Sequence, residues 1–546
     1  MLHEAGRARQ ILAVLARQGF DGLLNQLDLH PSFLTRVLPH PVPRKFPERI
    51  RLAAEELGPT FVKLGQFLSM RPDVVPYDIV LELRKLQDQV PPLPFEVMRP
   101  ILVEGLGREP SEVFDEFDET PTASASLAQV YIARLREGGQ QVAVKIQKPG
   151  IREKIEVDFD LAKWLAGILH QRVPTLRAMD LPAVVQEARE WMMRELDFRL
   201  EANNQEYFNT LNKYPEKVYA PNVYRDVSSE YVLVMDRVVG KSVRDAGDYS
   251  PEQRKVFAAN GATSIAHQIF ISGFFHADPH AGNIFITEDG RLCFLDWGLA
   301  GNLTRRLRYA VADFWSAAIE QDTERIVRIA ADLAAADARP DLRAMEKDIT
   351  LALREELNFA IGRASLGKAM LRLLFIFGQN GISLSRDYSL MAKAVLSIEE
   401  VGTALDPEFD LRAQVSPVLR ELVLERINPL TLARRTRDVL RQAVLGLQDL
   451  PFDLRRIVRR IENDSFTINL VHKGLEEQTE ALKVAANRIA LGVIIGSLVI
   501  GSSTIVTTGI QPHLFGYPAL GIVGYLISAL LAFYVIWDIM RHGRHK

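Results

Sequence analysis

The amino-acid sequence predicts an α+β protein with a helical extension at one end and two membrane-spanning helices at the other. Alternating apolar residues in SLAQVYIARL and QVAVKIQ, from Thr120 onward, predict an antiparallel hairpin. Most other segments have the apolar spacing of helices. The stretch from Ile489 to Trp537 contains no Lys, Arg, Asp or Glu, which is typical of segments that cross a bilayer.

Composition bounds the class of protein. The 546 residues exceed one ordinary domain. Lys plus Arg total 66 and Asp plus Glu total 69, so the net charge of -3 excludes a general attraction to nucleic acid. Cys293 is the only cysteine and lies among apolar residues, which indicates a buried thiol and a reducing compartment. The first 20 residues lack the features of a secretory signal peptide.

The pattern divides the chain into five parts. We expect a helical N-terminal extension over 1–118, whose second helical block begins near residue 47, and a lobe with strands over 119–238. A helical lobe should cover 239–425 and a basic helical linker 426–488, followed by a transmembrane hairpin over 489–537. The helical lobe shows no further chemical motif between residues 300 and 425.

The apolar end consists of two runs, Ile489 to Ile510 and Leu520 to Trp537, each close to the roughly 20 residues that cross a bilayer core. A short connector predicts a hairpin, and basic residues on both outer flanks place both ends in the cytoplasm. The alternative is a buried helical hairpin of a soluble core. Gly492 and Gly496 form a small-xxx-small pair that allows either close packing of the two spans or a homodimer.

The linker carries a cluster of arginines, which either meets the anionic face of the membrane or forms a solvated helix face. These residues are Arg434, Arg435, Arg437, Arg441, Arg455, Arg456, Arg459 and Arg460.

The stretch FHADPHAGNIFITEDGRLCFLDWG holds the strongest chemical pattern. Its centre predicts a short hairpin, so the loop with Asp278 and Asn283 and the loop with Asp296 should lie side by side. Carboxylate and amide oxygens suit Mg²⁺, which we assign to Asn283 and Asp296. Asp278 is then left to orient an attacking group or accept its proton, as expected for phosphoryl transfer from ATP on the protein-kinase fold.

That interpretation requires a lysine on a strand and an acidic partner on a helix. Lys145 in VAVK meets the first requirement, because Ala143 and Lys145 share one face of the strand. On a single helix through RELDFRLEANNQ, Asp197 and Glu201 would share a face that Glu195 does not. We therefore assign Glu201 as the partner of Lys145.

The phosphate loop before Lys145 reads PTASASLAQVY, with alanines where an ordinary kinase has glycines. Alanine lacks the backbone freedom of glycine, so the loop should hold nucleotide differently. We assign nucleotide contacts to Ala123, Ala125, Ser126 and Val130.

These motifs together resemble the UbiB (ADCK) family of atypical kinase-like proteins, bacterial type. They are Lys63-Leu64-Gly65-Gln66 (KxGQ), the alanine-rich loop, Glu195-Leu196-Asp197 (ExD), His276 to Asn283, and Asp296-Trp297-Gly298. Ser124, Ala281 and Trp297 depart from the family's usual alanine, proline and phenylalanine, but none of the three departures removes a ligand or a charge.

The resemblance implies a protein-kinase-like two-lobe fold whose N-terminal extension packs over the lobes. It assigns a regulatory role to Lys63, Gln66, Glu195 and Asp197, with Lys63 meeting Glu195 or Asp197, and makes protein phosphorylation unexpected. In the sequence itself, Leu57, Phe61, Leu64 and Leu68 form an apolar stripe at helical spacing, with Lys63 and Gln66 on an adjoining face.

The leading hypothesis is a membrane-anchored, Mg²⁺-dependent ATPase that supports ubiquinone (isoprenoid quinone) biosynthesis, as the resemblance implies. It would lie in the cytoplasmic membrane with its kinase-like part facing the cytoplasm. Membrane lipids, quinone precursors and quinone-biosynthesis proteins are its expected partners, and nucleic acid is not. The alternatives are a kinase acting on a small molecule or lipid headgroup, and a nucleotide-switched scaffold without turnover.

Overall fold

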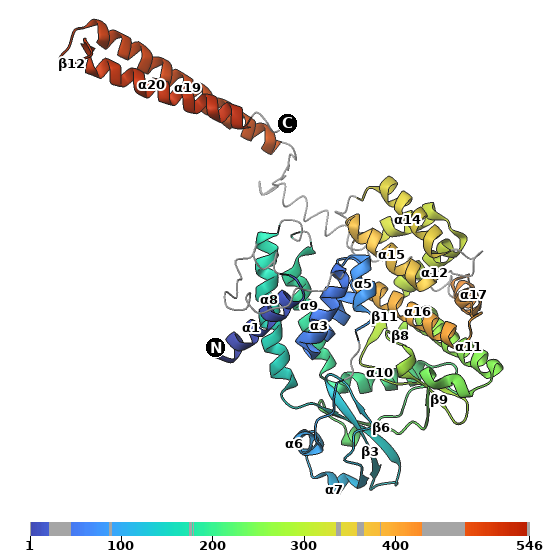
Figure 1. Ribbon diagram of the computed structural model, residues 1–546. Helices are drawn as coiled ribbons and strands as arrows, with labels where there is room; N and C mark the ends of the chain where they lie inside the picture. The colour runs from blue at the N-terminus through green and yellow to red at the C-terminus, as the bar shows by residue number, and fades with distance from the viewer. Residues whose placement is uncertain are drawn as a thin grey trace, which may run out of the picture. The chain divides into compact units, whose positions relative to one another are not determined.

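A computed structural model describes residues 2–20, 45–86, 90–173, 177, 179–334, 340–357, 365–382, 384–427 and 475–542. The chain forms two compact units, Met1–Ala433 and Arg434–Lys546. The first unit has two lobes joined by long helices, and Figure 1 shows its sheet beneath a cluster of helices. The arginine cluster of the linker lies outside the described residues.

The first lobe is built on one antiparallel sheet in the order β1-β3-β4-β6, with β2 paired to β3. The predicted hairpin is confirmed as β3 and β4. The expectation of helix up to residue 118 was wrong, because Phe114–Phe117 adds an edge strand to β3. The strands are β1 (Phe114–Phe117), β2 (Ala123–Ser124), β3 (Ala128–Leu135), β4 (Gln141–Gln147) and β6 (Val232–Asp236).

The two faces of this sheet differ as the alternation in β4 predicts. Val142, Val144 and Ile146 are fully buried, and they pack in one cluster with Met98 and Leu102 of α6 (Phe95–Leu106). Side chains on β4 alternate between faces, so Ala143 and Lys145 point the other way. The face opposite α6 is therefore free to carry the site.

Three helices connect the lobes: α8 (Ile151–Arg172), α9 (Leu181–Glu195) and α10 (Phe198–Leu211). The single helix expected through Glu195, Asp197 and Glu201 is wrong. The chain turns at Leu196, and the Asp197 side chain accepts a hydrogen bond from the Arg199 amide as the N-cap of α10. This break lets the carboxylates of Glu195 and Glu201 point to different partners.

The second lobe places short strands beside a helical core. The predicted hairpin around EDGR is confirmed as β9 and β10, which lie in the sheet β5-β10-β9-β7, while β8 pairs with β11. The strands are β5 (Val218–Tyr219), β7 (Gly240–Ser242), β8 (Phe274–His276), β9 (Ile284–Thr287), β10 (Leu292–Phe294) and β11 (Ala300–Asn302). The helices are α11 (Pro251–His267), α12 (Arg305–Glu320), α13 (Thr323–Leu333), α14 (Leu342–Glu356), α15 (Leu366–Gln379), α16 (Arg386–Leu405) and α17 (Leu411–Ile427). Short turns of this lobe are η3 (Val243–Asp248), η4 (Gln268–Ser272) and η5 (Ala281–Asn283), whereas the turn η2 (Arg225–Val227) contacts β6 of the first lobe.

The N-terminal extension consists of α1 (Leu2–Arg17), α3 (Phe46–Leu57), α4 (Pro59–Ser69) and α5 (Tyr77–Leu83), with α7 (Pro110–Val113) before the sheet. The expected stripe through Leu57 is wrong as one helix, because Gly58 at φ 96° separates α3 from α4. On α4 the buried apolar side chains are Val62 and Phe67, whereas Leu64 and Leu68 are partly buried. Arg71 ties the end of α4 to Glu187 of α9.

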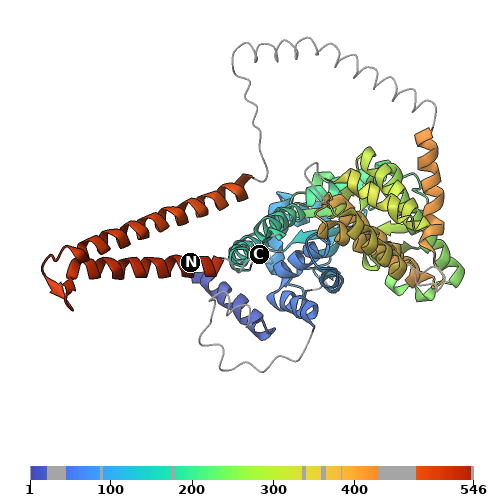
Figure 2. The same cartoon turned by 90° about the horizontal axis from the view of Figure 1, so that it is seen from above.

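The second unit contains two long apolar helices, α19 (Leu475–Thr507) and α20 (Ala519–His542), which lie side by side in Figure 2. A short hairpin, β12 (His513–Leu514) and β13 (Tyr517–Pro518), joins them. Ala485–Thr507 and Ala519–Trp537 are long and apolar enough to cross a membrane, and 6% and 11% of these windows are buried. Within the second unit, these helices are therefore not covered as the core helices of a soluble protein are.

The two helices approach each other through glycines of α20. A Cβ built on Gly524 would lie 2.0 Å from the Ser502 Oγ, and one on Gly521 would lie 2.5 Å from Val506. Gly492 and Gly496 meet nothing within 4 Å, so the expectation that they pack the two spans together was wrong. Pairing of two chains through these glycines stays a prediction.

Candidate functional site

The centre of the site is a buried ion pair between the sheet and α10. Lys145 on β4 donates to both carboxylate oxygens of Glu201, at 2.9 and 2.7 Å, and the Glu201 side chain is only 4% exposed. Glu201 is therefore the partner of Lys145, as the sequence predicted. The lysine also lies 5.2 Å from the centre of the Phe198 ring.

The alanine-rich loop lies next to this lysine across the sheet. Ala123 pairs with Val130 in register, and Val130 pairs with Lys145, so the three residues share one face. Beyond β2, the amide of Ala125 donates to the Ala128 carbonyl at 2.9 Å, which closes the loop tightly. Ser126 is buried, and its hydroxyl has no hydrogen-bond partner among the described residues. A buried polar atom of this kind in the alanine-rich loop fits a site that receives a polar ligand.

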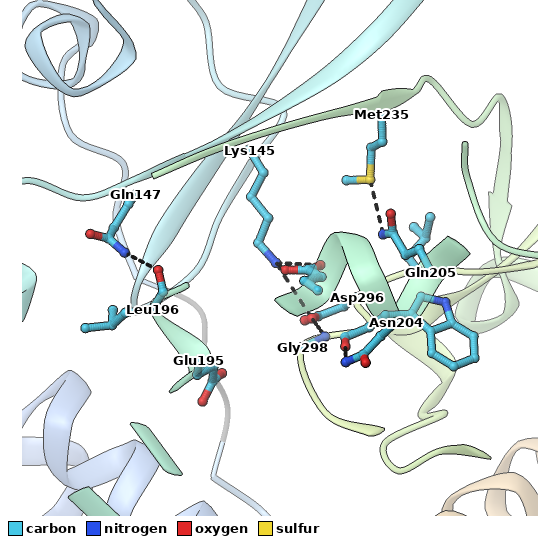
Figure 3. A network of polar contacts seen from close by, with 12 residues as sticks. Lys145, Gln147, Glu195, Leu196, Asn204, Gln205, Met235, Asp296 and Gly298 are labelled. Carbon is cyan, nitrogen blue, oxygen red and sulfur yellow. Dashed lines mark hydrogen bonds and ion pairs between the residues drawn. The ribbon is translucent and has the colours of Figure 1, made fainter. Parts of the chain in front are cut away.

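The loop after β10 brings a third charge to the lysine. Asp296 has φ 50°, and its Oδ1 lies 3.7 Å from Lys145 Nζ. Asn204 of α10, one turn beyond Glu201, donates to the Trp297 carbonyl at 2.9 Å, so one helix positions both carboxylates (Figure 3). Trp297 is fully buried and stacks on Phe208 at 4.5 Å.

The charges of this cluster reinforce one another. The Lys145 ammonium holds the pKa of the Asp296 carboxyl well below its usual range, against the opposing effect of burial. Burial lowers the pKa of Lys145, but Asp296 and Glu201 outweigh burial and raise it above its ordinary value. The lysine and Asp296 therefore stay ionised across the physiological range.

The β9–β10 hairpin brings the two proposed Mg²⁺ ligands to neighbouring loops. The Leu295 amide donates to the Asn283 carbonyl at 2.8 Å, which places Asn283 beside the residue before Asp296. Among the described residues, no group of three or more His, Cys, Asp or Glu side chains could hold a metal ion. One carboxylate and one amide oxygen still fit Mg²⁺, which in nucleotide sites takes its remaining ligands from phosphates and water.

A buried histidine joins the loop of Asp278 to the loop of Asp296. His276 Nδ1 accepts a hydrogen bond from the Asp278 amide at 3.0 Å, and Nε2 lies 2.9 Å from the Leu295 carbonyl. The ring must therefore carry its hydrogen on Nε2 and be neutral. Burial lowers the pKa of His276, which keeps it in this form.

Asp278 has a partner that the sequence did not reveal. Lys393 Nζ on α16 lies 2.9 Å from Asp278 Oδ2. Burial would raise the pKa of the Asp278 carboxyl, but Lys393 and His280 lower it below its usual value. Lys393 belongs to the region that appeared to lack chemistry, and its one signal is a lone lysine in the apolar run LMAKAVL.

The KxGQ and ExD residues meet in part. Lys63 of α4 forms an ion pair with Glu195 at the end of α9, and a Cβ on Gly298 would lie 4.0 Å from the Glu195 side chain. The extension thus reaches the loop of Asp296. Asp197 instead pairs with Arg199 at 2.8 Å.

Gln66 donates weakly to the Leu86 carbonyl, at 3.4 Å, and so remains within the extension. The regulatory roles of Gln66 and of the other three residues stay predictions.

Comparisons with known proteins find family models and relatives that match this chain. Residues 85–330 match the ABC1 atypical kinase-like domain, and residues 473–541 match the ABC1/UbiB kinase-like C-terminal domain. A protein of Aeromonas salmonicida named "Probable protein kinase UbiB" is 32% identical over 78% of this chain and 80% of its own length. A protein of Xanthomonas campestris with the same name is 30% identical over 87% of this chain and 85% of its own length. An uncharacterised protein of Clostridium pasteurianum, encoded in the 5′ region of hydrogenase 1, is 29% identical over 98% of this chain and 99% of its own length.

Proposed function

We propose a function for this chain, which belongs to the UbiB family of ABC1 atypical kinase-like proteins. In this proposal it is a Mg²⁺-dependent ATPase that is anchored in the cytoplasmic membrane and supports ubiquinone biosynthesis. Its kinase-like unit would face the cytoplasm and act beside the bilayer on behalf of quinone precursors and the proteins that modify them. The observation that carries the proposal is the position of Lys145 between Glu201 and Asp296.

The residues divide the work of phosphoryl transfer. Lys145 binds the phosphates and Glu201 holds it in place, because a buried pair at 2.7 Å leaves the ammonium little freedom. Asn283 and Asp296 would hold Mg²⁺, which neutralises charge on the transferring phosphate when bound. Asp278, fixed through its amide by His276, orients the attacking group.

The acceptor is water or a small group rather than a protein in this proposal. The Lys63–Glu195 ion pair supports this view, because it fastens the extension beside the metal loop, where a bulky substrate would need room. The two apolar helices support the membrane anchor, with both ends on the cytoplasmic side.

The test is release of phosphate from ATP by the full chain in detergent, with and without anionic liposomes and Mg²⁺. Wild type is compared with Asp296→Asn and with Glu288→Gln, which changes an exposed carboxylate at the turn of the same hairpin. We expect Mg²⁺-dependent release by wild type and Glu288→Gln, and a loss of at least about 100-fold in Asp296→Asn.

A wild-type protein that binds nucleotide without releasing phosphate would overturn the ATPase proposal. Transfer of labelled phosphate to a lipid extract would then identify a kinase for a lipid headgroup or small molecule. No transfer would leave the nucleotide-switched scaffold.

A further inference from the structure

Lys393 lies at a position where a charged side chain lowers stability unless it is paired or functional. It is flanked along α16 by the buried residues Met391, Ala392, Ala394 and Val395. A charged side chain in such surroundings is retained only when it is paired or functional. Its ammonium lies 2.9 Å from Asp278 Oδ2, and the two side chains are 14% and 30% exposed. The pair therefore borders accessible space and is not enclosed in the core.

The catalytic loop itself offers no comparable cation. His280 uses Nδ1 to accept a hydrogen bond from the Gly282 amide, at 3.0 Å, and so caps its own turn. His276 is held neutral by its two hydrogen bonds. The Arg244 guanidinium lies against Gly282, where an added Cβ would be 3.0 Å from it. Lys393 is thus the permanent cation paired with Asp278 in the structure.

The two lysines approach the site from opposite lobes. Lys145 comes from the sheet and belongs with the inner phosphates of ATP, by its place in the kinase pattern. Lys393 comes from α16 and stands beside the carboxylate that faces the attacking group. An ammonium has three donors, so a lysine bound to Asp278 by one of them retains two for a phosphate.

We propose that Lys393 binds the terminal phosphate of ATP and holds it against Asp278. This inference rests on the proposed function for its role in turnover, but not for its role in binding. It assigns to α16 the part of the site that distinguishes ATP from ADP.

The experiment measures binding of Mg²⁺–ATP and Mg²⁺–ADP to the full chain in detergent, by displacement of a fluorescent nucleotide, together with phosphate release. Lys393→Met is compared with Lys393→Arg, which keeps the charge. Lys368→Met removes an exposed lysine of the neighbouring α15 and is the matched control.

In Lys393→Met we expect ATP to bind about 10-fold more weakly while ADP binding changes less than about 2-fold. The rate constant kcat should fall about 100-fold, with partial recovery in Lys393→Arg. Lys368→Met should match wild type in both assays.

Equal weakening of both nucleotides with a lowered Tm would show a purely structural pair and overturn the inference. Unchanged binding of both would overturn it as well. A wild type that binds ATP but does not hydrolyse it refutes the ATPase proposal alone, because the ATP-to-ADP ratio still decides the role of Lys393. Failure of wild type to bind ATP would refute both.

Discussion

Replacing Glu201 by Gln tests the ion pair on which the site depends. The change removes one charge and keeps the shape of a side chain that is 4% exposed and accepts two hydrogen bonds from Lys145. Breaking a buried pair in this way typically costs about 3–5 kcal/mol, since the remaining charge loses its partner.

The structure offers Lys145 a second partner, which reduces this cost. Asp296 Oδ1 lies 3.7 Å away, and two unit charges at that distance attract by about 4 kcal/mol before desolvation at an effective dielectric constant of about 20. The Gln oxygen can also accept one hydrogen bond. We therefore expect a net destabilisation of about 2 kcal/mol, or a fall in Tm of about 2–4 °C.

The same substitution should weaken nucleotide binding by more than its effect on stability implies. A lysine drawn toward Asp296 competes with Mg²⁺ for that carboxylate, so we expect Mg²⁺–ATP to bind about 10-fold more weakly. Thermal unfolding and fluorescent-nucleotide displacement measure the two effects. Glu206→Gln, on the same helix but in a half-exposed pair with Arg225, should shift stability by less than about 1 kcal/mol. A Glu201→Gln variant with the same Tm and the same affinity for Mg²⁺–ATP as wild type would refute the reasoning.

Three further predictions concern the metal loop and the apolar hairpin. Trp297→Ala removes a fully buried ring and should lower the free energy of unfolding by about 3–5 kcal/mol in urea titration, against about 1 kcal/mol for Trp297→Phe. The depressed pKa of Asp296 stabilises the folded state above the unfolded pKa of about 3.9, and this contribution is lost only as pH falls toward the lower folded pKa. The urea midpoints of wild type and Asp296→Asn should therefore keep their difference above about pH 5 and converge progressively below about pH 4. Gly524→Leu should force the apolar helices apart and abolish cross-linking between one cysteine introduced into each helix, whereas Gly492→Leu, with nothing within 4 Å, should not.

The sequence predicted those parts of the site that local patterns encode. Alternation located β4 and the face of Lys145, and the EDGR turn located the hairpin that brings Asn283 next to the Asp296 loop. Helical spacing alone failed at Leu196, because a turn between α9 and α10 leaves little trace in apolar periodicity. Glu201 was still assigned correctly as the partner of Lys145, and it lies in the first turn of α10.

A partner that no motif marks was missed. Lys393 meets Asp278 across 115 positions of the chain, and a single lysine in an apolar helix carries no spacing that could reveal its partner. The prediction of which glycines bring α19 and α20 together was wrong for a similar reason. Every glycine in an apolar span permits close approach, and the relative rotation of two helices decides which of them is used.

The two hydrogen bonds of His276 have a consequence for control of the protein. Adding a proton at Nδ1 would set two donors against each other, because the Asp278 amide already points at that nitrogen. The ring would have to release the catalytic loop in order to become charged, and burial opposes the charge. His276 should therefore stay neutral between about pH 6 and 8, where ordinary histidines titrate. A moderate fall in pH would leave this link between the loops of Asp278 and Asp296 intact.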